Sequence, residues 1–242
     1  MDLNTRISEK EKKLAKEWFE ELRDVICDAF EKIELKQELG PFKNSEPGKF
    51  KRKITRRQDK ANLDGGGGVM SVMRNGRVFE KVGVNVSTVY GELEPLAQKS
   101  LSSRHNIPGL KDDPRFWASG ISLVAHMQSP KTPAVHMNTR MFWTPDLTWF
   151  GGGSDLNPMV ENTVDTKFFH SCLKDACDRA DTNYYREFKA WADEYFMIKH
   201  WNEARGVGGI FFDDLHTENW ENDFTFVKNV GKAFLKAFSK IT

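Results

Sequence analysis

The chain has 242 residues, and its 36 Lys and Arg against 35 Asp and Glu give a formal net charge of +1. This length is enough for one domain with a substantial core, and the balanced charge argues against a nucleic-acid or membrane-surface partner. There is no apolar run near the roughly 18 residues of a membrane span and no secretory signal, so we expect a soluble protein. Three cysteines without metal-site spacing, Cys27, Cys172 and Cys177, favour a reduced, cytoplasmic location, and a mitochondrial one stays open.

The first predicted element is an amphipathic helix that begins near Ser8. Apolar residues recur from there in steps of three and four, with Lys and Glu between them. These apolar residues are Leu14, Trp18, Leu22, Val25, Ile26, Phe30 and Ile33. The basic stretch 39–64, which includes KFKRKITRR, lacks periodicity and predicts a surface loop with one short strand.

Residues 65–91 predict a hairpin of two strands joined at Asn75-Gly76, the dipeptide that best fits a two-residue type I′ turn. The four glycines 65–68 precede a strand rather than a helix, and no Gly-Lys-Ser follows them. We therefore interpret these glycines as a place of close backbone packing rather than as a phosphate loop.

The remaining sequence predicts further strands and helices in succession. A short helix is expected over 93–103, and strands over 116–126 and 133–143. Helical spacing around 168–176 and 188–198 is followed by the strand GVGGIFFDDL and a last helix over 223–238. Because hairpins dominate, the predicted fold class is α+β, with a large, mainly antiparallel sheet flanked by helices on both faces.

The most informative stretch is AVHMNTRMFWTPDLTWFGGGSDLN. Because strand side chains alternate between faces, His136, Asn138 and Arg140 share one face of an otherwise apolar strand. A glycine triplet then brings Asp155 on what we expect to be a flexible backbone segment, which lets the carboxylate approach a ligand closely. This set of groups predicts a pocket for a large, flat, anionic molecule.

Six segments in order over residues 65–215 form a recognisable set: FEKVGVNVSTVYG, GISLVAH, HMNTR, WFGGGSDLNP, YYREFKAWADEYFMIKH and RGVGGIFFDDL. Together they resemble the oxygen-dependent coproporphyrinogen III oxidase family. The resemblance implies oxidative decarboxylation of two propionates of coproporphyrinogen III to vinyl groups, giving protoporphyrinogen IX in heme biosynthesis. It also implies molecular oxygen as co-substrate, no organic cofactor and a homodimer.

The resemblance assigns roles to residues of the polar strand face. Arg140 matches a propionate clamp, because a guanidinium stays charged and holds a carboxylate bidentately. Asp155 matches an acceptor for the pyrrole N–H groups, and His136 matches a proposed general acid. The candidate catalytic residues are His136, Arg140 and Asp155, and the candidate substrate-binding residues are Ser122, Asn138, Thr139, Arg140 and Asp155.

Each of these residues also has a structural interpretation. A hydrogen-bonded histidine without chemistry is the alternative for His136, and an ion pair is the alternative for Arg140 and Asp155. Trp191 and Tyr195 lie on the apolar stripe of a helix, which favours a place in the core.

The neighbouring residues Asp213 and Asp214 are expected to point to opposite faces of a strand, with one of them anchoring another element. Phe211 and Phe212 are expected to split between the two faces in the same way.

Four histidines match a set treated as divalent-metal ligands in bacterial relatives, namely His126, His136, His170 and His200. They are scattered over strands and helices without local ligand spacing, so a metal is not favoured.

The sequence departs from the family pattern in several places. Lys60 and Asn62 stand where Trp and Arg are usual, Asn157 replaces a Thr, and Trp201 and Ala204 replace arginines, although Arg205 remains. We expect one coproporphyrinogen oxidase-like domain over residues 1–242 that lacks the family's C-terminal Arg-Gly-Arg-Tyr strand and Gly-rich segment. The alternative function is therefore a catalytically impaired tetrapyrrole-binding protein.

Overall fold

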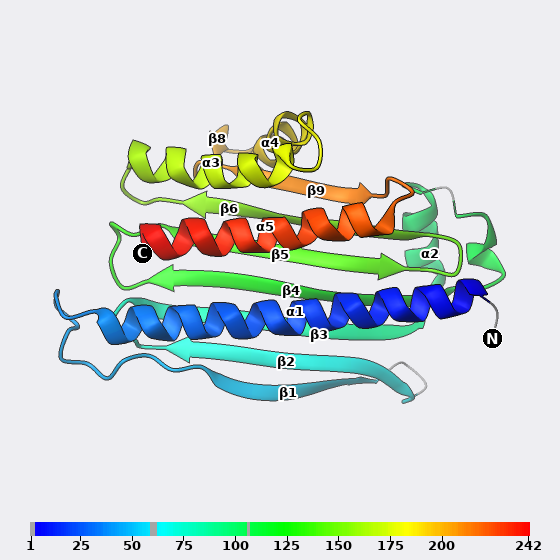
Figure 1. Ribbon diagram of the computed structural model, residues 1–242, viewed down its shortest axis with the longest axis horizontal. Coiled ribbons are helices and arrows are strands. Elements are labelled where there is room, and N and C mark those ends of the chain that lie inside the picture. The colour runs from blue at the N-terminus through cyan, green and yellow to red at the C-terminus, as the bar shows by residue number, and fades with distance from the viewer. Residues whose placement is uncertain (1–2, 59–61, 106) are drawn as a thin grey trace.

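The computed structural model describes residues 3–58, 62–105 and 107–242 (Figure 1). Within these ranges, seven antiparallel strands form one sheet in the order β1-β2-β3-β4-β5-β6-β9, and β7 and β8 form a separate hairpin. The strands are β1 (Lys51–Gln58), β2 (Asp64–Arg74), β3 (Phe79–Glu92), β4 (Arg115–Met127), β5 (Ala134–Trp143), β6 (Thr148–Asn157), β7 (Met197–Ile198), β8 (Glu203–Ala204) and β9 (Gly209–Leu215). The helices are α1 (Leu3–Lys36), α2 (Pro95–Ser102), α3 (Thr163–Asp178), α4 (Tyr184–Tyr195) and α5 (Trp220–Ile241), with a 3-10 turn over Pro108–Lys111. The predicted α+β class is confirmed.

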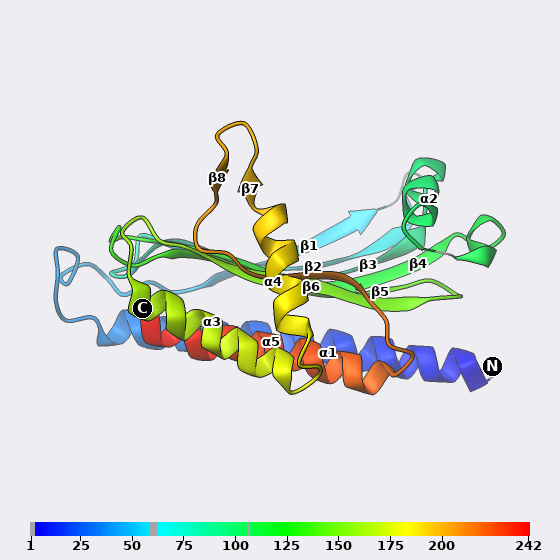
Figure 2. The same cartoon turned by 90° about the horizontal axis from the view of Figure 1, so that it is seen from above.

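The two faces of the sheet are covered unequally, as Figure 2 shows. The long helices α1, α3 and α5 lie side by side on one face, which we call the helix face. The other face, which we call the open face, carries α2, the last turns of α4 and the β7–β8 hairpin. Helices thus occur on both faces: α1, α3 and α5 cover the main core, and α2 covers a smaller buried cluster of Leu101, Ile107, Leu110 and Trp149.

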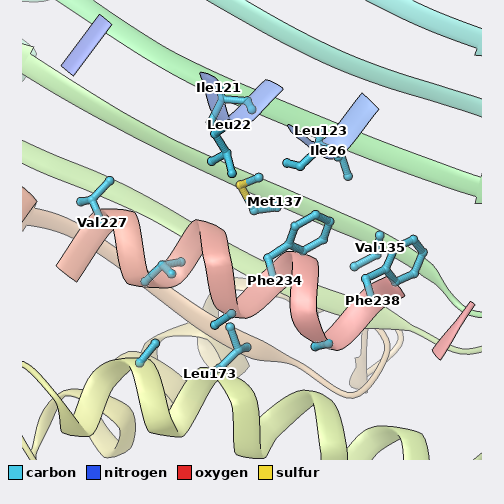
Figure 3. Close-up of a cluster of buried hydrophobic side chains, with 14 of the residues drawn as sticks. Leu22, Ile26, Ile121, Leu123, Val135, Met137, Leu173, Val227, Phe234 and Phe238 are labelled. Carbon is cyan, nitrogen blue, oxygen red and sulfur yellow. The ribbon is translucent and has the colours of Figure 1, made fainter. Parts of the chain in front are cut away.

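The hydrophobic core lies between the helix face and the three long helices. Figure 3 shows α1 side chains against β4, and α5 side chains against β5. The labelled core residues are Leu22, Ile26, Ile121, Leu123, Val135, Met137, Leu173, Val227, Phe234 and Phe238. Burial at roughly 25 cal/mol per Å² of apolar surface makes this layer the main source of stability, so the sheet is a rigid base for whatever its open face carries.

The β2–β3 hairpin is confirmed, but the predicted two-residue turn is wrong. The connection spans residues 75–78, and Asn75 has a φ of +53°. The reason is Glu34 of α1, whose fully buried carboxylate accepts hydrogen bonds from the backbone N–H groups of residues 77–79. A buried carboxylate is costly unless it accepts hydrogen bonds, and the longer connection lets these three N–H groups reach it.

The glycines at the start of β2 pack as predicted. A Cβ on Gly66, whose φ is +92°, would lie 2.2 Å from the carbonyl oxygen of Thr88 on β3.

Beside β2, the basic stretch forms the edge strand β1, and its predicted strand is confirmed. Lysines and arginines along such an edge discourage pairing with another chain. Of the two departures nearby, Asn62 precedes β2, and Lys60 lies outside the described residues.

Two further findings concern the residues that the structure describes. None of their helices is both long and apolar enough to cross a membrane. Cys27, Cys172 and Cys177 are all buried free thiols.

Candidate active site

A cavity of about 600 Å³ lies on the open face, above β4, β5, β6 and β9. Strand residues form its floor, and its walls come from the end of α4, from Arg205 and from Arg104. The lining residues include Arg104, Ser122, His136, Asn138, Arg140, Asp155, Trp191, Tyr195, Phe196, Arg205, Phe211 and Asp213. The volume lies in the range of small-molecule binding sites.

The register of the sheet explains the flat floor of this cavity. Asn138 of β5 is paired with Ser122 of β4 on one side and with Gly153 of β6 on the other. Arg140 is likewise paired with Gly120 and Gly151. Because the cross-strand neighbours are small, the polar side chains of β5 have room to lie along the sheet. A flat ligand can therefore approach this surface closely.

Thr139 does not belong to this floor. It is fully buried on the helix face, and its hydroxyl has no hydrogen-bond partner among the described residues. The alternation that directs Asn138 and Arg140 to the open face directs Thr139 away from it. We therefore remove Thr139 from the candidate substrate-binding residues.

The glycine triplet is part of the buried strand β6, and the predicted flexible segment is wrong. A Cβ on Gly151 would lie 2.5 Å from Oδ1 of Asp213 and 3.0 Å from Nη2 of Arg140. Glycine is required there because it leaves space for this ion pair. Asp155 is consequently held on a strand that is paired on both sides, with β5 and β9, rather than on a loop.

The first polar cluster of the cavity is centred on Asp155, whose side chain is 3 % exposed. Its Oδ2 accepts hydrogen bonds from Nδ2 of Asn157 at 2.7 Å and from Nη2 of Arg205 at 2.9 Å, and it lies 3.3 Å from Nδ1 of His136. Burial raises the pKa of Asp155, but the hydrogen bonds from His136 and Asn157, with the charges of His136 and Arg205, outweigh burial and lower it below 3.8. The carboxylate is thus ionised near neutral pH.

The second cluster is centred on Asp213 of β9. Its Oδ1 accepts from Nη2 of Arg140 at 2.7 Å, and its Oδ2 accepts from Nη1 of Arg104 at 3.2 Å. Asp214 turns away and contacts Nε2 of His105 at 2.8 Å. The two neighbouring aspartates therefore have different partners, and both hold the segment that follows α2.

The wall beside β9 is aromatic. Phe211 stacks on Tyr195 with ring centroids 4.4 Å apart and meets the edge of Trp191 at 5.1 Å. Tyr195 and Trp191 are 61 % and 38 % exposed, so their predicted place in the core is wrong. Helix α4 crosses the edge of the sheet, since its Phe188 packs on the buried Phe212 while its last turns reach the open face.

The four histidines matched to a metal set lie apart. His126 is exposed on β4, His136 lines the cavity, and His200 is exposed in the β7–β8 hairpin. His170 is engaged at both ring nitrogens, by the Tyr185 hydroxyl and the Val207 carbonyl, each at 3.0 Å. Among the described residues, no group of three or more His, Cys, Asp or Glu side chains is arranged to hold a metal ion. These histidines therefore do not fit a shared metal.

Sequence reasoning missed Arg104 and Asp213 as site residues and mentioned Arg205 only as a remaining cation. The pair FDD was a visible signal, because two acidic residues at the end of a strand can pair with cations beside the sheet. The expected split of Asp213 and Asp214 between the two faces is wrong, because β9 bulges there opposite Gly151 and both carboxylates contact the segment after α2. Asn157, noted as a departure from the family pattern, proves to be a direct hydrogen-bond donor to Asp155.

The chain is similar to proteins of one family over almost its whole length. The family model described as coproporphyrinogen III oxidase matches residues 14–242. The chain is 48% identical over 235 residues to the oxygen-dependent coproporphyrinogen-III oxidase of Rickettsia bellii (strain RML369-C), covering 97% of this chain and 79% of the relative. It is 48% identical over 230 residues to the protein of the same name from Rickettsia conorii (strain ATCC VR-613 / Malish 7), covering 95% and 77%.

Proposed function

Because the chain belongs to the coproporphyrinogen III oxidase family, we propose that its open-face cavity catalyses oxygen-dependent oxidative decarboxylation of coproporphyrinogen III. Two propionates become vinyl groups, and the product is protoporphyrinogen IX of heme biosynthesis. The observation that carries this proposal is the convergence of His136, Arg140 and Asp155 in one cavity. The names of the relatives do not favour the alternative of an impaired tetrapyrrole-binding protein.

The cavity suits the shape and charge of this substrate. Coproporphyrinogen carries propionates on its rim and pyrrole N–H groups at its centre. The cavity offers guanidinium groups from Arg104, Arg140 and Arg205, and a buried carboxylate from Asp155. Guanidinium groups bind carboxylates bidentately, whereas an ionised carboxylate only accepts hydrogen bonds. The cations therefore suit the rim, and the carboxylate suits the centre.

Asp155 is the acceptor for the pyrrole N–H groups. Its three polar neighbours all contact Oδ2, and no other described residue donates to Oδ1. The oxygen Oδ1 is thus left to accept from the ligand, while Oδ2 keeps the carboxylate fixed. The lowered pKa of Asp155 keeps it ionised for this task.

His136 is the proton-transfer group. Its Nδ1 faces Asp155, which orients the ring, and among the described residues its Nε2 has no hydrogen-bond partner. In each oxidation, the carboxylate leaves as carbon dioxide and the side-chain carbon attached to the pyrrole ring loses one hydrogen. Molecular oxygen takes up the two electrons, that proton and one further proton to become hydrogen peroxide. An imidazole titrates closest to neutral pH, so His136 can exchange the proton that this step requires.

The proposal extends to conditions and assembly. It includes molecular oxygen as co-substrate, no organic cofactor, a homodimer and a cytoplasmic location. Its support is the family resemblance of the six sequence segments and, for the location, the three buried free cysteines.

The test is to incubate the purified protein with coproporphyrinogen III in air and to identify the products by chromatography with mass detection. Anaerobic and chelator-treated samples are the controls. We expect protoporphyrinogen IX in air with or without chelator, and none without oxygen. Unchanged substrate in air would overturn the proposed function, and loss of product after chelation would overturn the metal-free reaction.

A further inference from the structure

Two arginines of the cavity, Arg104 and Arg140, are joined by Asp213, and this cluster suggests how a substrate propionate is held. We propose that Arg104 and Arg140, joined by Asp213, form a paired-arginine subsite for a substrate carboxylate. In this subsite, which rests on the proposed function, Arg104 and Arg140 contact the ligand and Asp213 is a positioning residue.

The geometry of the triplet separates the two signs of charge. Each oxygen of Asp213 holds one guanidinium, at 2.7 Å for Arg140 and 3.2 Å for Arg104. The Asp213 side chain is 9 % exposed, whereas those of Arg140 and Arg104 are 40 % and 51 % exposed. A ligand in the cavity therefore meets the cations and not the carboxylate, and the triplet carries one net positive charge.

The guanidinium groups keep donors for a ligand. Each presents five N–H donors in a planar fork, and the contacts with Asp213 use only one nitrogen of each residue. Without Asp213, the two neighbouring guanidinium groups would repel each other, and no carboxylate would hold them in a fixed orientation. With it, both forks are oriented before a carboxylate arrives, which lowers the cost of binding.

The surroundings show that this arrangement is built into the fold. Gly151 leaves the space in which Arg140 and Asp213 meet. On the other side, the next residue, Asp214, has a φ of +66° and contacts His105, whose ring packs on Trp149 at 4.4 Å. A left-handed backbone is uncommon for a residue other than glycine. Two successive links, from Arg104 and His105, therefore fix the segment after α2 against the end of β9.

The two carboxylates of the cavity thus have separate tasks. Asp155 is surrounded by an imidazole, an amide and one guanidinium, and keeps an oxygen for N–H donors. In Asp213 both oxygens face arginines, and Oδ1 also accepts from the backbone N–H of Asp214. The pyrrole centre and the carboxylate rim of the substrate are consequently recognised by different clusters.

The test measures binding without turnover, by fluorescence titration of coproporphyrin III, the oxidised form of the macrocycle, and of its tetramethyl ester. We expect Arg104→Ala to raise the Kd of the acid roughly tenfold, the usual effect of losing a charged hydrogen bond, and to leave that of the ester unchanged. Asp213→Asn should also raise the Kd of the acid. The double variant should bind more weakly than either single variant, but its fold-increase in Kd should be smaller than the product of the two single fold-increases. Arg104→Lys should restore part of the affinity, since it returns the charge but not the fork.

Arg115→Ala is the matched control, because Arg115 pairs with Asp113 on the surface and is outside the cavity lining. Steady-state assays with coproporphyrinogen III should show a larger rise in KM than fall in kcat for Arg104→Ala. Unchanged Kd values for both single variants, or an equal loss for acid and ester, would overturn the subsite. Absence of product from every protein, wild type included, would instead overturn the proposed function, and the titrations would still decide the subsite. Arg104 is half exposed, so its variants should fold even if Asp213→Asn does not.

Discussion

The helix face and the open face of β5 receive alternate residues of one strand, yet they differ in almost every physical respect. On the helix face, Val135, Met137 and Met141 are at most 1 % exposed and pack in the core. On the open face, His136 and Arg140 keep 30 % and 40 % of their side chains exposed and contact the buried Asp155 and the half-buried Asp213, respectively. Strand alternation thus separates the residues that provide stability from those that provide chemistry, at a spacing of one residue.

The open face also differs in how it distributes charge. Its anions, Asp155 and Asp213, are at most 9 % exposed, whereas their arginine partners are 40 % exposed or more. A carboxylate ligand is attracted to such a surface, whereas the residues that β5 turns to the helix face, Val135, Met137, Thr139 and Met141, carry no charge. Substitutions at neighbouring positions of one strand should therefore reduce either stability or ligand binding and turnover, depending on the face.

The largest expected effect is on stability, at Phe212. This fully buried ring packs against Phe188 at 5.3 Å and Phe226 at 5.1 Å. Phe212→Ala should lower the free energy of unfolding by about 4 kcal/mol, because it opens a cavity in the core. Phe211→Ala, one residue away on the open face, should cost only about 1 kcal/mol in lost aromatic contacts. Urea unfolding of both variants measures this, and equal losses would contradict the separation of the two faces.

The next effect is on turnover, at His136. His136→Ala should lower kcat about 100-fold, the size of a lost proton-transfer group, and should lower the free energy of unfolding by no more than about 1 kcal/mol, because it removes one hydrogen bond to Asp155. His126→Ala is the matched control, because it removes an exposed histidine of the same face outside the cavity lining. Steady-state kinetics with coproporphyrinogen III decide the matter. A full rate in His136→Ala would leave that residue with only a structural role.

These local contrasts are the part of the molecule that sequence alone predicts well. The alternation of β5 and the split of Phe211 from Phe212 follow from the two-residue period of a strand. The family motifs added the class of ligand, and hairpin spacing gave the antiparallel sheet. Each of these inferences depends on neighbours within a few residues.

The features that the sequence did not predict depend on contacts between residues far apart in the chain. Asp213 meets Arg140 and Arg104, which are 73 and 109 residues away. Glu34 alters a turn more than 40 residues downstream. The apolar stripe of α4 did predict a helix, but periodicity could not show that the helix crosses the edge of the sheet and exposes Trp191 to the cavity.

A smaller effect is expected from pH, through Asp155. Its pKa is lower in the folded protein than in the unfolded chain, so it contributes stability above the unfolded value of about 4, and this contribution is lost as pH falls through the folded value. The difference in free energy of unfolding between wild type and Asp155→Asn should be on the order of 1 kcal/mol at about pH 5 and should shrink toward about pH 3. Other carboxylates are common to both proteins and cancel. A difference that does not change with pH would show that Asp155 is not held ionised by its neighbours.

The smallest effect should come from the aromatic wall. Trp191 contacts Phe211 edge to face and borders the cavity, so Trp191→Ala should weaken the binding of coproporphyrin III about threefold, as the loss of one partly exposed aromatic contact. Trp201→Ala is the matched control, since Trp201 is 68 % exposed at the β7–β8 hairpin and is not a lining residue. Because the tetramethyl ester presents the same flat ring, Trp191→Ala should weaken acid and ester equally, unlike Arg104→Ala. If Trp191→Ala weakened only the acid, the wall would act through the neighbouring charges, and the division of the open face into an aromatic wall and two polar clusters would be wrong.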